Sequence, residues 1–109
     1  MKNIISNINK AFDHRIRLGI MSVLMVNDFV DFKTIRDLMG ATDGNIASHT
    51  KALEKHNYIK VEKSFINRKP NTKYIVTDTG KKAFIEHLDA LEKLLKASND
   101  FDIGLKHKF

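Results

Sequence analysis

The chain of 109 residues contains no cysteine and no long hydrophobic run. Without cysteine there is no disulfide framework, no thiolate metal site and no cysteine nucleophile. The longest apolar stretch, residues 20–26, is interrupted by Ser22 and is much shorter than a bilayer span requires. The N-terminal residues also lack the continuous apolar block of a secretory signal peptide. We therefore expect a cytoplasmic protein that does not cross a membrane.

The sequence also lacks the common motifs of catalysis and metal binding. None of its five histidines forms an H-x-x-x-H or H-E-x-x-H pair, and no glycine-rich phosphate loop is present. Ser48 and His49 are neighbours, so on a helix they diverge by about 100° and cannot act as nucleophile and base. We expect no enzyme activity, no metal and no other cofactor. The alternative is a metal site between subunits, formed from Asp13, His14, Glu86, His87 and Asp89.

The positive charge of the chain is concentrated in its middle third. Residues 42–73 contain seven lysine or arginine residues and three acidic ones, whereas residues 74–109 contain six of each. At this length we expect one domain over residues 1–109, with a single core. A basic segment in such a domain indicates a polyanionic partner, although a solvated lysine face is an alternative explanation.

Three helices are predicted in the first half of the chain. Isoleucine, phenylalanine and leucine recur at every fourth position from Ile4 to Leu24, which predicts a first helix over residues 1–27. Residues 33–57 form the next unit, a short helix that stops at Gly40 and a third helix that begins at Thr42 as its N-cap. The short turn between these two helices is typical of a helix-turn-helix.

A β-hairpin and a long helix are predicted in the second half. Residues 58–77 contain two segments of alternating apolar and polar residues, separated by the polar sequence NRKPNT at 67–72. A long amphipathic helix follows over residues 78–97, and a tail of mixed character occupies 98–109. The fold class is therefore mainly α with a small hairpin, in the order α-α-α-β-β-α of a winged helix-turn-helix.

The third helix has an apolar face and a polar, basic face. At about 100° per residue, Ile46, Thr50 and Leu53 share one arc and should face the core. The opposite arc carries Gly44, Ser48, Lys51 and Lys55, with Asn45 and Ala52 beside it. A recognition helix contacts base edges with its N-terminal residues. Gly44 would allow close approach to a phosphate there, or it is simply a tolerated glycine near a helix start.

These segments resemble the small winged-helix transcriptional regulators related to the MarR and ArsR families, in particular their compact subgroup. The resemblance covers about residues 15–95 and is most specific in DFKTIRDLMGATDGNIASHTKALEKHNYIKVEKSF and TKYIVTDTGKKAF. Asn57 stands where glycine is usual at the exit of the third helix, and asparagine also tolerates the left-handed conformation.

The resemblance implies a homodimer that binds a pseudo-palindromic DNA duplex and leaves room for an unidentified small-molecule effector. The implied DNA-binding residues are Thr42, Asp43, Gly44, Asn45, Ser48, His49, Lys51, Arg68, Lys69 and Lys73. To these we add Lys55, which lies on the basic face of the third helix. The apolar stripes of the first and last helices are longer than a monomer of this size needs. Our dimer candidates, which could also close the monomer core, are Ile4, Ile8, Leu88, Leu91 and Leu95.

Other binding functions remain alternatives. A winged helix can also bind an acidic protein, because the fold alone does not determine function. An RNA-binding module is less well supported, because Tyr58 and Tyr74 are better explained as core residues than as stacking platforms for unpaired bases. His49, at the edge of the third helix, is expected to donate to DNA or, alternatively, to be half-buried and bonded to a backbone carbonyl.

Overall fold

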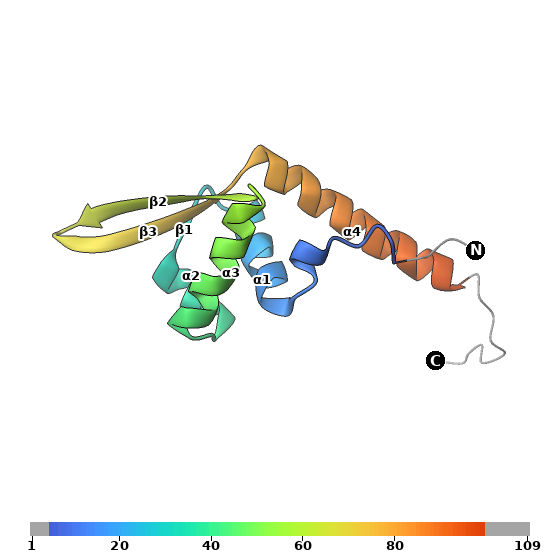
Figure 1. Cartoon of the computed structure of the whole chain (residues 1–109), viewed down its shortest axis with the longest axis horizontal. Helices are drawn as coiled ribbons and strands as arrows, with labels where there is room; N and C mark the ends of the chain where they lie inside the picture. The colour runs from blue at the N-terminus through green and yellow to red at the C-terminus, as the bar shows by residue number, and fades with distance from the viewer. Residues whose placement is uncertain (1–4, 100–109) are drawn as a thin grey trace.

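Residues 5–99 of a computed structural model form a three-helix body that carries a β-hairpin on one side and a long helix on the other (Figure 1). The body consists of α1 (Arg15–Met25), α2 (Phe32–Met39) and α3 (Asp43–Lys55). The hairpin strands are β2 (Ile59–Ile66) and β3 (Lys69–Val76), and the long helix is α4 (Asp78–Asn99). The predicted winged helix-turn-helix fold with a long C-terminal helix is confirmed.

The prediction of one continuous first helix within residues 1–27 is wrong for the residues that the structure describes. A short 3-10 helix at Lys10–Phe12 precedes α1, which begins only at Arg15. His14 has extended backbone angles, and its Nδ1 accepts a hydrogen bond from the N–H of Ile16, so it acts as the N-cap. Phe12 is fully buried against Tyr58 and Phe84, so its place in the apolar stripe reflects tertiary packing.

The helix-turn-helix is closed by local caps, as predicted. Gly40 ends α2 in the left-handed conformation, with φ of 59°. The hydroxyl of Thr42 accepts the N–H of Asn45 at 3.2 Å and starts α3. Asn57 has φ of 63° directly after α3, so asparagine provides the left-handed exit. Sequence and local geometry therefore agree over this segment.

The sheet has three antiparallel strands in the order β1-β3-β2, and its short first strand, β1 (Val30–Asp31), lies between α1 and α2 and was not predicted as a strand. The turn between β2 and β3 has two residues, Asn67 and Arg68, with φ of 51° and 66°. The polar loop expected over residues 67–72 is therefore shorter, and Pro70 belongs to β3. Since β1 pairs only with Lys73 and Tyr74, β3 has a free side at Pro70, where proline is tolerated.

The core lies between the three helices of the body, the base of the hairpin and the start of α4. Its buried apolar side chains are Ala11, Phe12, Ile16, Ile20, Met21, Leu24, Val30, Ile35, Ile46, Leu53, Ile59, Tyr74, Val76 and Phe84. The hydroxyl of Thr77 accepts the N–H of Gly80 at 2.9 Å at the opening of α4. A Cβ at Gly80 would lie 2.0 Å from the carbonyl oxygen of Tyr58, so α4 can leave the hairpin at this angle only with glycine there.

Candidate nucleic-acid interface

The outward face of α3 has the composition that its sequence predicted. Ile46, Thr50 and Leu53 are buried on the inner face. The exposed residues on the outer side are Gly44, Asn45, Ser48, Lys51 and Lys55. No atom outside the local backbone lies within 4 Å of a Cβ built on Gly44, so packing in the folded chain does not explain this glycine.

The start of α3 contains two predicted contact residues that already have partners within the chain. Thr42 uses its hydroxyl to cap the helix. The carboxylate of Asp43 accepts a hydrogen bond from Arg36 of α2 at 3.1 Å, and Arg36 also contacts Asp37 at 3.3 Å. This guanidinium offsets a negative charge that would otherwise repel a phosphate at the helix start.

His49 faces α1 instead of standing free on the recognition helix. Its Nδ1 accepts a hydrogen bond from Nε of Arg17 at 2.9 Å, and its ring centroid lies 4.1 Å from that of His14. Partial burial is the main cause that lowers the pKa of His49 below its ordinary value, and the positive charges of the nearby His14 and Arg17 lower it further. Of the two alternatives for His49, the structure shows the half-buried one, with the side chain of Arg17 in place of a backbone carbonyl. Sequence analysis did not single out Arg17. The two residues are 32 positions apart, so no local pattern could reveal this contact.

The three predicted basic residues of the hairpin lie in two different places. Arg68 and Lys69 are exposed at its turn, whereas Lys73 lies opposite Asp31 of β1, near the middle of the sheet. The Nζ of Lys73 is 4.3 Å from the ring centroid of Phe29, a cation–π contact. The free cationic tip of the hairpin therefore consists of Arg68 and Lys69.

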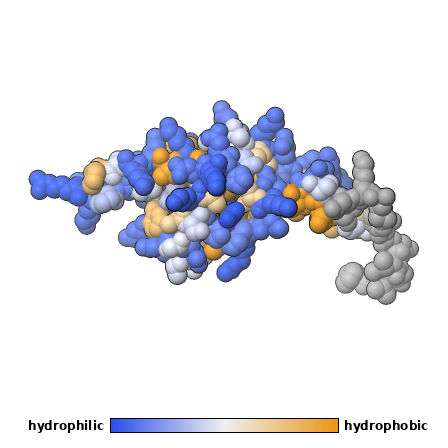
Figure 2. Space-filling view, viewed as in Figure 1, coloured by the Kyte–Doolittle hydropathy of each residue, from blue (hydrophilic) through white to orange (hydrophobic). Residues whose placement is uncertain are grey.

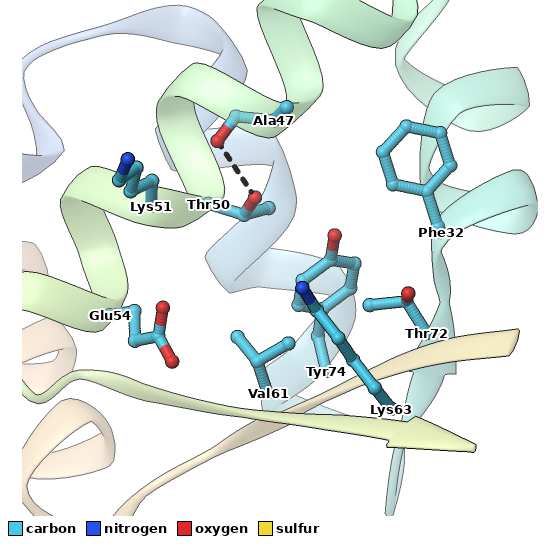
Figure 3. A pocket seen from close by; sticks show the side chains of 9 residues that line it. All are labelled: Phe32, Ala47, Thr50, Lys51, Glu54, Val61, Lys63, Thr72 and Tyr74. Atoms are coloured by element: carbon cyan, nitrogen blue, oxygen red, sulfur yellow. Dashed lines mark hydrogen bonds between the residues drawn. The ribbon is translucent and has the colours of Figure 1, made fainter. Parts of the chain in front are cut away.

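A groove of about 380 Å³ separates α3 from the hairpin. Its lining residues are Phe32, Ala47, Thr50, Lys51, Glu54, Val61, Lys63, Thr72 and Tyr74 (Figure 3). Lys51 and Lys63 supply positive charge from the two sides, whereas Glu54 lies between α3 and the strands. Burial raises the pKa of Tyr74, an effect that a hydrogen bond with Thr50 partly offsets and that the charge of Glu54 supports, so the phenol stays neutral. Lys63 is a further basic residue that sequence analysis did not assign to the site.

The predicted dimer residues on α4 form an exposed apolar face. Leu88, Leu91 and Leu95 are 45%, 37% and 68% exposed. Figure 2 shows hydrophobic side chains at this end of the molecule, where the N-terminal segment lies beside α4. Ile8 is half-buried in that segment, and Ile4 lies outside the described residues.

His87 holds the N-terminal segment against α4. It is only 3% exposed, and its Nδ1 accepts the backbone N–H of Asn9 at 3.1 Å. The side-chain amide of Asn9 donates in turn to the hydroxyl of Tyr58 at 3.1 Å. Within residues 5–99, no cluster of three or more histidine and carboxylate side chains is arranged to hold a metal ion. In the same part of the chain, no helix has the length and apolar character to cross a bilayer.

The three-helix body, its exposed polar and basic third helix and the basic hairpin together define a winged helix-turn-helix protein. Residues 16–95 match the family model described as a winged helix DNA-binding domain, and the chain belongs to this family. The hairpin is therefore the wing, and α3 is in the position of the recognition helix. The resemblance to small MarR-like regulators is confirmed.

The chain is also similar to individual proteins. A transcriptional regulator homologue from Pyrococcus horikoshii OT3 is 27% identical, with a TM-score of 0.78 over 88% of this chain and 93% of that chain. The protein MJ0432 of Methanocaldococcus jannaschii is 28% identical over 87 residues, which are 80% of this chain and 95% of that protein. ZitR from Lactococcus lactis, a zinc-responsive MarR family member, shares the fold at 16% identity, with a TM-score of 0.61 over 92% of this chain and 66% of that chain.

Proposed function

We propose that this DNA-binding regulator acts as a homodimer on a pseudo-palindromic operator, which it recognises through α3 and the wing. The observation that carries the proposal is the exposed polar and basic face of α3 together with the exposed cations Arg68 and Lys69 at the wing tip. A helix with small polar residues at its start fits the major groove, and the cationic tip fits the neighbouring backbone.

Residues on this surface should divide into two classes. Asn45 and Ser48, near the start of α3, can hydrogen-bond base edges and would determine which sequences are preferred. Lys51, Lys55 and Arg68 are exposed positive charges that would bind phosphate groups. Because every sequence has the same phosphates, these contacts would strengthen binding to all sequences alike. The hydrogen bond between Arg17 of α1 and His49 of α3 holds the recognition helix against α1.

Selection of bound duplexes from a random pool tests this proposal. A palindrome with half-sites about one helical turn apart is expected if two copies place their third helices in successive major grooves. Lys51→Glu should then weaken binding to all selected sequences, whereas Asn45→Ala should change the preference at one position of each half-site.

A failed selection would favour a different function. If no sequence is enriched and the protein instead forms a stable complex with an acidic protein, the winged-helix interaction module is the better description. If sequences are enriched but show no repeat of a half-site, DNA binding stands and the dimeric arrangement is wrong.

A further inference from the structure

The wing exposes an aromatic side chain close to its tip. Phe65 is 76% exposed and lies opposite Pro70 in the register of β2 and β3. Residues of a strand alternate between its two faces, so Phe65 shares a face with Val61 and Lys63. That face lines the groove beside α3, and the pair of Phe65 and Pro70 continues it toward the tip. Ile66, which is 48% exposed, lies on the opposite face.

The hairpin segment that carries this apolar pair has only positive charges. Residues 63–72 contain Lys63, Arg68 and Lys69 and no acidic residue. An apolar contact for another protein would not need this concentration of cations, whereas a polyanion requires it. Apolar side chains flanked by cations are the means by which proteins enter the minor groove and part a base step.

The shape of the wing fits the same occupant. When α3 lies in the major groove of DNA, one sugar-phosphate backbone runs along the side of α3 that faces the hairpin. Lys51 and Lys63 lie there, on the two sides of the groove between α3 and the hairpin. The tip then meets the adjacent minor groove, which is only about 6 Å wide in B-DNA. The hairpin ends in a turn of two residues, Asn67 and Arg68, so no long loop stands between Phe65 and a groove at the tip.

We propose that Phe65, supported by Pro70, is an apolar wedge that enters the minor groove beside the half-site and partly unstacks a base step. This inference rests on the proposed function. It implies a preference for flexible pyrimidine–purine steps at the flank of the operator, where α3 does not reach, because such steps are unstacked most easily.

The effect of the wedge can be measured on a duplex selected by the wild-type protein from a random pool. Phe65→Ser should lower affinity about tenfold, as expected for the loss of one aromatic–base contact. The slope of log affinity against log salt should stay unchanged, because no charge is removed. Phe65→Trp should retain affinity, and Ile66→Ser, on the other face of the same tip, is the matched control that should bind as the wild type does.

Fluorescence reports on the contact itself. The chain contains no tryptophan, so Phe65→Trp and Ile66→Trp each introduce a single indole. Addition of the selected duplex should quench the indole at position 65 by stacking and leave the indole at position 66 largely unaffected. In a duplex with 2-aminopurine at the flanking step, emission should rise with the wild-type protein and not with Phe65→Ser.

The outcomes separate this inference from the function on which it rests. If the wild type selects a duplex and Phe65→Ser binds it equally well, or if both indoles respond alike, the wedge is wrong and the regulator stands. If Phe65→Ser changes only self-association or the binding of a protein, the tip is a protein contact and the wedge is again wrong. If the wild type selects no duplex, the proposed function fails and the wedge fails with it.

Discussion

At the residue scale, Gly44 sits in the first turn of α3 with open space around the position of its missing side chain. Glycine there lowers helix propensity by about 1 kcal/mol relative to alanine, and neither packing nor a positive φ compensates for this loss. Close approach of the helix start to a phosphate would explain the glycine, because free backbone N–H groups and the positive helix end are directed there.

Gly44→Val should therefore weaken binding to the selected duplex by at least about tenfold, because the new side chain keeps the helix start from the backbone. Its melting temperature should stay close to that of the wild type, since the side chain enters open space. Electrophoretic mobility shift and thermal unfolding measure the two effects. A large loss of stability with unchanged binding would show that Gly44 is a structural residue.

His87 makes the stability of the protein depend on pH. Burial lowers its pKa below the ordinary value of 6.5, an effect that the nearby carboxylate of Asp13 partly opposes. The unfolded chain therefore binds a proton more readily than the folded one. The stability of the fold that depends on a neutral His87 is therefore complete above about pH 7. It is lost as the pH falls through 6.5 toward the lower folded-state pKa.

His87→Asn should reduce this pH dependence. Asparagine places an acceptor oxygen near the position of Nδ1 but does not titrate, so the free energy of unfolding should fall less between pH 7.5 and pH 5.5 than in the wild type. The smaller side chain should also cost about 1–3 kcal/mol at pH 7.5. Urea denaturation at both values measures the difference. Asn9→Ala is the control: it retains the backbone donor to His87, so it should keep the wild-type pH dependence. If the free energy of unfolding falls equally with pH in all three proteins, His87 is not the group responsible.

At the scale of elements, the wing and the N-terminal segment depart most from the expected structure. The wing strands continue to a two-residue turn, and Lys73 lies at the sheet with its ammonium over Phe29. The N-terminal segment bends at Phe12 because that ring packs between Tyr58, which precedes β2, and Phe84 of α4. In both cases a contact between distant segments determined the local conformation.

The tip and the sheet of the wing should respond differently to the loss of one positive charge. Arg68→Gly should lower DNA affinity and reduce the salt slope by about 1, while Asn-Gly, a favoured two-residue hairpin turn, raises the free energy of unfolding by up to about 1 kcal/mol. Lys73→Ala is the matched control, which should lose about 0.5–1 kcal/mol of stability with its cation–π contact and change the slope less. Equal changes of slope would place Lys73 on the DNA.

At the scale of the whole molecule, the exposed apolar face of α4 carries the proposed dimer interface. Leu91→Glu should shift sedimentation from dimer to monomer, since a charge would be buried between the two helices. DNA affinity should fall more than tenfold, because the two half-sites are no longer bound by linked subunits. Lys82→Glu, on the polar side of α4, is the control that should remain dimeric. A wild type that sediments as a monomer at micromolar concentration would contradict this interface.

The sequence by itself determined the order of the four α-helices and the two hairpin strands, and the two faces of α3. Caps and periodicity are local, so Gly40, Thr42 and the spacing of Ile46, Thr50 and Leu53 were sufficient to predict a helix-turn-helix and its outward residues. The basic hairpin followed from alternation and from the polar segment around Pro70.

Only the tertiary structure decided which of these residues are available to a partner. The positions of Arg17 beside His49, of Lys73 over Phe29 and of Lys63 at the groove all depend on contacts between segments far apart in the chain. Such contacts leave no period in the sequence, because their geometry depends on how whole elements pack. The same packing leaves Phe65 exposed beside the basic tip and buries Phe12 under α4, although the two side chains are chemically identical.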